Sequence, residues 1–184
     1  MKSLHIHVGT LNIHPISTPI LAQPESIAEP FTTGAANTTT QHTKILADGT
    51  HLPAGSDRTD HVAVIDHATG LMWAVESLGS TNDPEAGISQ EACQARCSEL
   101  RLLGHSDWRL PTRSELAGLV DDTRHEPAID TSLFPRVKPR WHWTSTAAAW
   151  SSASAWLVYF HDGNVDDYHR CYEGFALACR RSGQ

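Results

Sequence analysis

The sequence predicts a mixed α+β domain, on three observations. A hairpin pattern occupies residues 61–73, two segments with helix caps follow at 89–103 and 112–121, and an alternating strand lies at 155–160. We therefore expect one domain over residues 44–184, preceded by an extended arm over residues 1–43.

Length and composition narrow the class of protein. The chain of 184 residues is long enough to bury a real core, and its net charge of −7 leaves no basic stripe for nucleic acid. No apolar run approaches the length of a membrane-spanning helix. Pro15 and Pro19 interrupt what would have to be the apolar core of a signal peptide. The compartment stays open, and a cell-surface or virion location reached by another export route fits.

The arm at residues 1–43 differs in composition from the rest. Residues 4–8 alternate and predict one short strand, whereas residues 15–43 are rich in Pro, Thr, Ala and Ser and have no period. Two interpretations stay open: the arm contacts another copy in a homo-oligomer, or it is a mobile tail.

The first predicted element of the domain is a hairpin. His61 to Ile65 read as a strand, Asp66 to Gly70 as a turn, and Leu71 to Trp73 as the returning strand. We assign Trp73 to the core.

The first predicted helix begins at the N-cap Ser89, has Glu91 in its first turn, and runs to Leu103 before Gly104. Its apolar residues recur three or four positions apart and share one face. They are Ala92, Cys93, Cys97 and Leu100. Cys93 and Cys97 are therefore expected to point inward.

The second predicted helix follows a loop. Thr112 and Glu115 have capping-box spacing, and the helix is expected to end near Asp121 with a buried stripe. That stripe consists of Leu116, Leu119 and Val120. Arg109, in the preceding loop, is interpreted as tying down backbone carbonyls or a carboxylate. Further on, Leu133 and Phe134 are expected to cover an edge of the core.

The C-terminal stretch has a strand with two contrasting faces. Alternation over residues 155–161 places Trp156, Val158 and Phe160 on a core face. Leu157, Tyr159 and His161 then lie on a displayed face. Residues 162–172 read as a polar loop, so that the displayed face and this loop form a binding surface.

Several motifs in fixed order resemble the Lcl-type C-terminal domain family. They are Thr69-Gly70-Leu71-Met72-Trp73, Asp107-Trp108-Arg109-Leu110-Pro111-Thr112 with Glu115-Leu116, Trp143-Thr144-Ser145, Ala155 to Phe160 with Gly163-Asn164-Val165, and Cys179-Arg180-Arg181. The resemblance covers residues 62–181. It implies a C-type-lectin-like fold, with two helices, an antiparallel sheet and long irregular loops.

The end of the chain is similar to the variable region of diversity-generating retroelement proteins. There, an error-prone reverse transcriptase rewrites adenines, mostly in Asn codons of the AAC type, so that any codon ending in C results. Such codons never encode Trp, Lys, Glu, Gln or Met. The resemblance implies exchangeable ligand contacts that obey this restriction: Leu157, Tyr159, His161, Asp162, Asn164, Asp166, Asp167, Tyr168, His169, Cys171 and Tyr172. Trp150 does not obey it and would be a fixed anchor.

The resemblance implies a non-catalytic protein that recognises a protein or glycan ligand on another cell or particle. Tyr, Asp, Asn and His are also the mixture found in antibody paratopes. Two alternatives stay open: an adhesin or fimbria-associated domain with one fixed partner, and an oxidase-like enzyme of the formylglycine-generating kind. That enzyme would use Cys171 and Cys179 as a thiol pair, with copper.

The four cysteines allow more than one pairing. The lectin-like fold implies a bridge between Cys97 and Cys179, and a bridge between Cys93 and Cys171 is a further alternative.

No metal, cofactor or catalytic group is predicted. Asp162, Asn164, Asp166 and Asp167 offer oxygen ligands, but no EF-hand loop surrounds them. The proline motif of calcium-dependent lectins is also missing, since residues 126–128 read Glu-Pro-Ala. The 12 histidines are scattered along the chain, and no Gly-x-Ser-x-Gly elbow supports Ser-His-Asp catalysis.

Overall fold

The computed structural model describes residues 41–183, which form two helices and two antiparallel sheets and confirm the α+β class. The predicted strand at 4–8 and most of the predicted arm lie outside the described residues. The elements are β1 (His42–Ile45), β2 (His51–Pro53), β3 (Ala63–Asp66), β4 (Leu71–Ala74), α1 (Gln90–Glu99), α2 (Arg113–Ala117), β5 (Trp141–Ala148), β6 (Ser151–Tyr159), β7 (Asn164–His169) and β8 (Cys179–Arg181).

The first sheet has the order β2-β1-β3-β4-β8. Its centre is the predicted hairpin of β3 and β4, in which Ala63 faces Ala74. Asp66 holds the turn by accepting hydrogen bonds from the backbone N–H and the hydroxyl of Thr69, and Gly70 closes the turn at a φ of 67°. β1 begins at His42, two residues before the predicted domain start.

Helix α1 begins as predicted but ends earlier. The Ser89 side chain accepts a hydrogen bond from the backbone of Ala92, and Cys93 and Cys97 are buried. The helix ends at Glu99 rather than at Leu103, because Leu100 has an extended backbone and Leu103 adopts a φ of 54°. The leucines at 100, 102 and 103 pack against the core from this irregular segment.

Helix α2 has the predicted capping box, formed by Thr112 and Glu115. Arg109 donates two hydrogen bonds to the Glu115 carboxylate, at 2.9 and 2.8 Å, which confirms its structural role. The helix ends at Ala117, four residues before the expected end, and Gly118 caps it. Its stripe is nevertheless apolar, with Leu116 fully buried.

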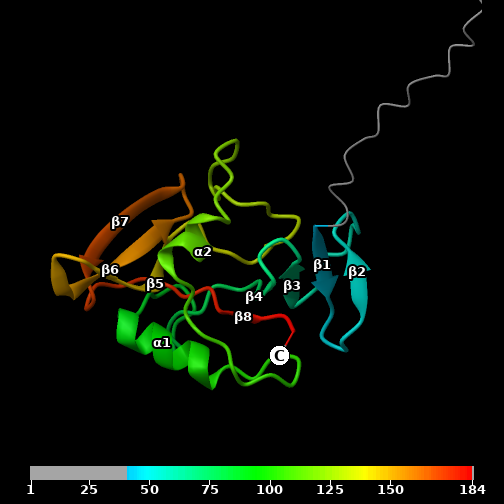
Figure 1. Cartoon of the computed structure of the whole chain (residues 1–184), viewed down its shortest axis with the longest axis horizontal. Helices are drawn as coiled ribbons and strands as arrows, with labels where there is room; N and C mark the ends of the chain where they lie inside the picture. The colour runs from blue at the N-terminus through cyan, green and yellow to red at the C-terminus, as the bar shows by residue number, and fades with distance from the viewer. Residues whose placement is uncertain (1–40, 184) are drawn as a thin grey trace, which may run out of the picture. The chain divides into compact units, whose positions relative to one another are not determined.

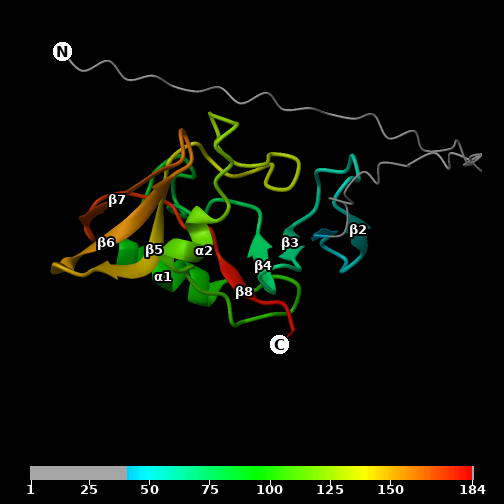
Figure 2. The same cartoon turned by 45° about the horizontal axis from the view of Figure 1, so that its top comes forward.

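The second sheet has the order β5-β6-β7. Figures 1 and 2 show its three strands standing together at one end of the domain, away from β1 and β2. Ala148 pairs with Ser151 next to the tip between β5 and β6, where Trp150 lies. Gly163, with a φ of 87°, turns β6 into β7. α1 packs against β5, and α2 packs against β5 and β6.

Two core clusters lie on opposite faces of the strands. Ala63, Met72 and Leu157 belong to one cluster, and their chain neighbours Val64, Trp73 and Val158 belong to the other. Successive residues of a strand point to opposite faces, so both faces of β3, β4 and the middle of β6 are buried. In the described part of the chain, neither helix is long and apolar enough to cross a membrane.

Candidate ligand-binding surface

A row of five aromatic rings crosses one face of the second sheet. Neighbouring ring centroids are 5.3 Å apart for His161 and Tyr159, 4.5 Å for Tyr159 and Trp141, 5.4 Å for Trp141 and Tyr168, and 5.7 Å for Tyr168 and Tyr172. We call these five residues the aromatic row. Tyr168 and Tyr172 are 38% and 59% exposed, and the other three are half-buried. The row therefore presents a fixed, partly polar aromatic surface to solvent.

The pairing register of the three strands places these aromatic side chains next to one another. Trp141 pairs with Tyr159, and Tyr159 pairs with Asn164. Further along, Ala155 pairs with Tyr168. Directly paired residues share a face, so three consecutive strands deliver these side chains to one surface.

Leu157 does not belong to the displayed surface. It is 1% exposed and lies in a core cluster with Trp143 and Ala155, so the prediction that it contacts a ligand is wrong. Leu157 is buried because core side chains cover both faces of the middle of β6. Val158 and Phe160 are fully buried as predicted, whereas Trp156 is only half-buried.

The polar run at 162–172 is mainly a strand rather than the predicted loop. Residues 164–169 form β7, an edge strand, in which Val165 packs on the core and its neighbours stay exposed or half-buried. Asp162 caps the turn before it by accepting hydrogen bonds from the backbone and the side chain of Asn164. The Asp166 carboxylate accepts one from the backbone of Asp167.

These acidic side chains do not converge. Among residues 41–183, no group of three or more His, Cys, Asp or Glu side chains is placed to hold a metal ion. Asp162 and Asp166 are exposed and bonded to their own turn and strand, which is the arrangement of a solvated acidic edge.

The turn after β7 is tied to helix α1. Arg170 donates from its guanidinium to the Gln90 side chain at 3.0 Å and to the Ser152 carbonyl at 2.9 Å. The Gln90 backbone N–H in turn donates to the Arg170 carbonyl at 2.9 Å. Tyr172 and the exposed side chains of His169 and Cys171 therefore stand on an anchored turn.

Trp150 is exposed, but on the other side of the sheet from the aromatic row. It is 66% exposed, and its ring meets Trp156 edge-on at 5.5 Å. Trp156 alternates with Tyr159 along β6, and the Arg113 guanidinium lies 3.8 Å from its ring centroid. Trp150 and the row thus form two separate surfaces.

The four cysteines are all free thiols in the structure. Cys93, Cys97 and Cys179 are fully buried, and Cys171 is exposed. Burial raises the pKa of both Cys97 and Cys179 to about 12, and the nearby Cys179 adds to the shift at Cys97. The two thiols therefore interact electrostatically within the core, and neither is bridged. By contrast, Cys171 and Cys179 do not form a solvent-open pair.

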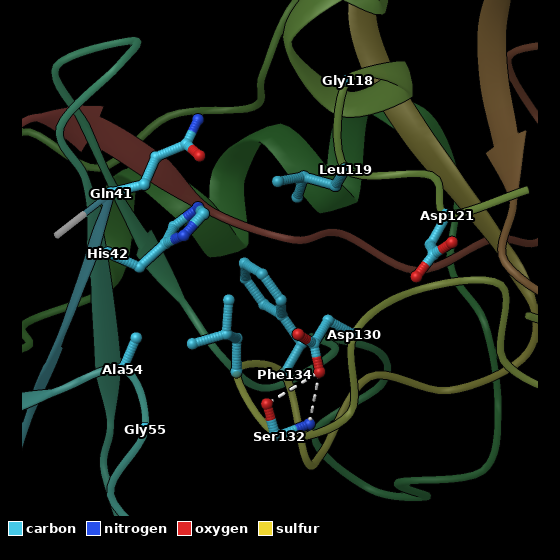
Figure 3. A pocket seen from close by; sticks show the side chains of 11 residues that line it. Gln41, His42, Ala54, Gly55, Gly118, Leu119, Asp121, Asp130, Ser132 and Phe134 are labelled. Atoms are coloured by element: carbon cyan, nitrogen blue, oxygen red, sulfur yellow. Dashed lines mark hydrogen bonds between the residues drawn. The ribbon is translucent and has the colours of Figure 1, made fainter. Parts of the chain in front are cut away.

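A separate cavity of about 360 Å³ lies near β1 (Figure 3). Its wall combines Phe134 with His42 and two carboxylates, Asp121 and Asp130. Both carboxylates are already used, since Asp130 accepts two hydrogen bonds from Ser132 and Asp121 bonds to the turn that follows it. The cavity therefore lacks a set of free polar groups aimed at a ligand.

Trp141, the centre of the row, is not among the ligand contacts predicted from the sequence. The signal was the spacing of Trp141 and Trp143, which period-2 alternation places on one face of a strand. Trp143 is fully buried, whereas Trp141 lies at the margin of the core and faces the tyrosines.

Comparison with known proteins identifies the family. No curated protein matches the chain. Residues 62–180 match the model of the Lcl C-terminal domain, which is more than half of the chain. The match runs from the start of the central hairpin, through both helices and the sheet that carries the aromatic row, into β8. The chain therefore belongs to the Lcl C-terminal domain family.

Proposed function

We propose that this protein is a non-catalytic ligand-binding protein with a C-type-lectin-like fold, which displays a variable C-terminal surface of the diversity-generating retroelement kind. The observation that carries the proposal is the aromatic row. Four of its five rings are Tyr or His, whose codons can end in C, and they surround one ring whose codon cannot. Exchangeable contacts around a fixed centre are what a diversified binding surface requires.

Packing supports this division between scaffold and contacts. Trp143, which breaks the codon restriction, is buried, and Trp141, which also breaks it, packs against a core cluster. The exposed positions on β7 and in the following turn make few bonds beyond their own neighbourhood. Substitutions there leave most of the folding free energy untouched, because exposed side chains contribute little to it.

The ligand class follows from the chemistry of the row. Tyrosine rings supply large contact areas at low rotamer cost, and the flanking Asp and Asn side chains supply adaptable hydrogen bonds. Such an exposed, polar-edged aromatic surface suits a protein or a glycan on a cell or particle surface, rather than a small molecule that needs a deep pocket.

The experiment is an inspection of the DNA around the gene. The proposal predicts a nearby reverse-transcriptase gene and a near-copy of the DNA for residues 141–172 that differs from it at adenines. Codons of the exposed positions should end in C, and the codons of Trp141 and Trp143 should match between the copies.

Two outcomes separate the proposal from its alternative. Differences scattered over all bases, or the absence of both the near-copy and the reverse transcriptase, would overturn the diversification. A surface that is nevertheless required for capture would then belong to an adhesin with one fixed partner.

A further inference from the structure

The exposed thiol of Cys171 has an imidazole partner. Its Sγ lies 3.0 Å from Nδ1 of His169. The backbone N–H of Cys171 also points at that nitrogen, at 3.4 Å, and a backbone N–H can only donate. Nδ1 is therefore the lone-pair nitrogen of a neutral imidazole, placed to accept the thiol proton.

The pair is held rigidly. The Tyr172 backbone N–H donates to the His169 carbonyl at 2.9 Å and closes the turn. The Arg170 backbone N–H donates to the Ala153 carbonyl at 2.8 Å and fixes the turn to β6. With the bond from the Gln90 backbone to Arg170, the thiol and the imidazole stand on a turn tied to both a strand and a helix.

A cavity of about 430 Å³ opens beside the thiol. Cys171 and His169 form one wall, and Ser89, Glu91 and Gln94 at the start of α1 contribute to the other. The cavity is reachable from solvent, and its volume suits a small molecule.

The remaining thiols provide a contrast within the same chain. Cys93, Cys97 and Cys179 are fully buried. Burial raises the pKa of each, to about 12 for Cys97 and Cys179, so they stay protonated at neutral pH. Only the Cys171 thiol combines exposure with a proton acceptor among the cysteines, all of which the structure describes.

We propose that Cys171 is a thiol–disulfide exchange site that takes a low-molecular-weight disulfide, with His169 as the proton acceptor. The thiol proton passes to Nδ1 of His169, and the thiolate attacks one sulfur of the disulfide RS–SR. The S–S bond breaks, and a mixed disulfide forms between Cys171 and one RS group. The second RS group leaves as a thiolate and takes the proton from the imidazolium. The disulfide itself is the oxidant, so that no other reagent is consumed. The site lies within the stretch proposed to be exchangeable, so it is a property of this chain's own residues there, and its exchange reaction does not require ligand capture by the aromatic row.

The test uses the folded full chain and the aromatic disulfide 5,5′-dithiobis(2-nitrobenzoate), whose released thiol is counted by absorbance. The expected result is one rapid equivalent per native chain, mapped to Cys171 by mass spectrometry. Cys171→Ser should release none in the same time. Oxidised glutathione should give a mixed disulfide at the same residue.

Two further variants test the role of His169. His169→Ala and His169→Asn should each slow the reaction about tenfold, because the thiol loses the nitrogen that accepts its proton. His51→Ala removes an exposed imidazole of the other sheet and should leave the rate unchanged. Near-ultraviolet circular dichroism checks that every variant is folded. A rate that does not change in both His169 variants, or equally rapid labelling of the three buried cysteines, would overturn the proposal.

Discussion

Trp141 and Tyr159 stack with their ring centroids 4.5 Å apart and an angle of 15° between their planes. Trp141 comes from β5 and Tyr159 from β6, and the strand pairing places them directly opposite each other. Each ring restricts the rotamers of the other. The surface is thus ordered before a ligand arrives, which lowers the entropy that binding must overcome.

Truncating the centre of the row should cost more stability than truncating its end. Trp141 packs on the core and contacts two tyrosines, so Trp141→Ala should lower the free energy of unfolding by about 2 kcal/mol. Tyr172→Ala, at a 59% exposed residue, should change it by less than about 0.5 kcal/mol. Urea unfolding of both variants measures the difference. Equal losses would show that the row has no scaffold centre.

Mild acid should destabilise the domain through His142. This residue is fully buried, its Nε2 lies 2.7 Å from the Ser77 hydroxyl and its Nδ1 2.8 Å from the Arg140 carbonyl. Burial lowers the pKa of His142 from 6.5 to about 4. Between these values the unfolded chain binds a proton that the folded chain does not, so stability falls as the pH drops from 6.5 to about 4.

The expected loss from His142 over that window is about 3 kcal/mol. The buried His61 has a lowered pKa for the same reason and adds to the slope. Urea unfolding at pH 7 and at stepwise lower pH measures the sum. His142→Gln should flatten the dependence, while the same change at the exposed His51 should not. A slope that His142→Gln leaves unchanged would contradict this assignment.

The contact between Arg109 and Glu115 should matter for the stability of the loop that leads into α2. The Glu115 carboxylate accepts two hydrogen bonds from Arg109 and one from the Thr112 backbone at 2.7 Å. Glu115→Ala should therefore cost about 2 kcal/mol. Glu99→Ala, at an exposed residue near the end of α1, is the matched control and should cost less than about 0.5 kcal/mol. Similar thermal unfolding of the two variants would refute the prediction.

The Glu115 carboxylate makes the stability of the domain depend on pH in a second, more acidic range. The bonds from Arg109, aided by Thr112, lower the pKa of Glu115 from 4.5 to about 2. Its stabilisation is present above 4.5 and is lost as the pH falls through about 2, below the window of His142.

In an oxidising compartment, we expect Cys97 and Cys179 to form a bridge. Both are fully buried, and the thiol of Cys179 contributes to the raised pKa of Cys97. A bridge that closes a loop of this length would add about 4 kcal/mol of stability. Peptide mapping without reductant, after expression in an oxidising compartment, should find the linked pair. A link between Cys93 and Cys171, or four alkylated cysteines, would contradict the pairing.

Local signals in the sequence predicted the elements that local chemistry determines. The caps at Ser89 and Thr112 and the turn at Gly70 are short-range features, and the structure has all three. The helix ends were misplaced, because the leucines after Glu99 turn toward the core from an irregular segment. Packing against residues distant in sequence determines where such a helix ends, and no local sequence pattern indicates this position.

The binding surface was harder to predict, because alternation identifies two faces but not what covers them. On β6, Leu157 and Val158 point to opposite faces and both are buried, since each face meets a different core cluster. Tyr159 lies on the face of Leu157 and is half-buried. How far the core extends over each face of β6 depends on packing against other elements, and period-2 spacing does not indicate it. The edge position of β7 explains why its polar residues were taken for a loop.

We expect the aromatic row to capture the ligand, and a binding measurement with matched variants tests this. Wild-type protein is applied to arrays of immobilised glycans and purified surface proteins. A triple variant, with Tyr159, Tyr168 and Tyr172 changed to Ala, is applied in parallel. Trp150→Ala is the matched control, because it removes an exposed ring from the opposite side of the sheet. The Trp150→Ala protein should bind normally. We expect the triple variant to lose the wild-type signals while its melting temperature stays within a few degrees of wild type. A folded triple variant that still binds the same array members would contradict it.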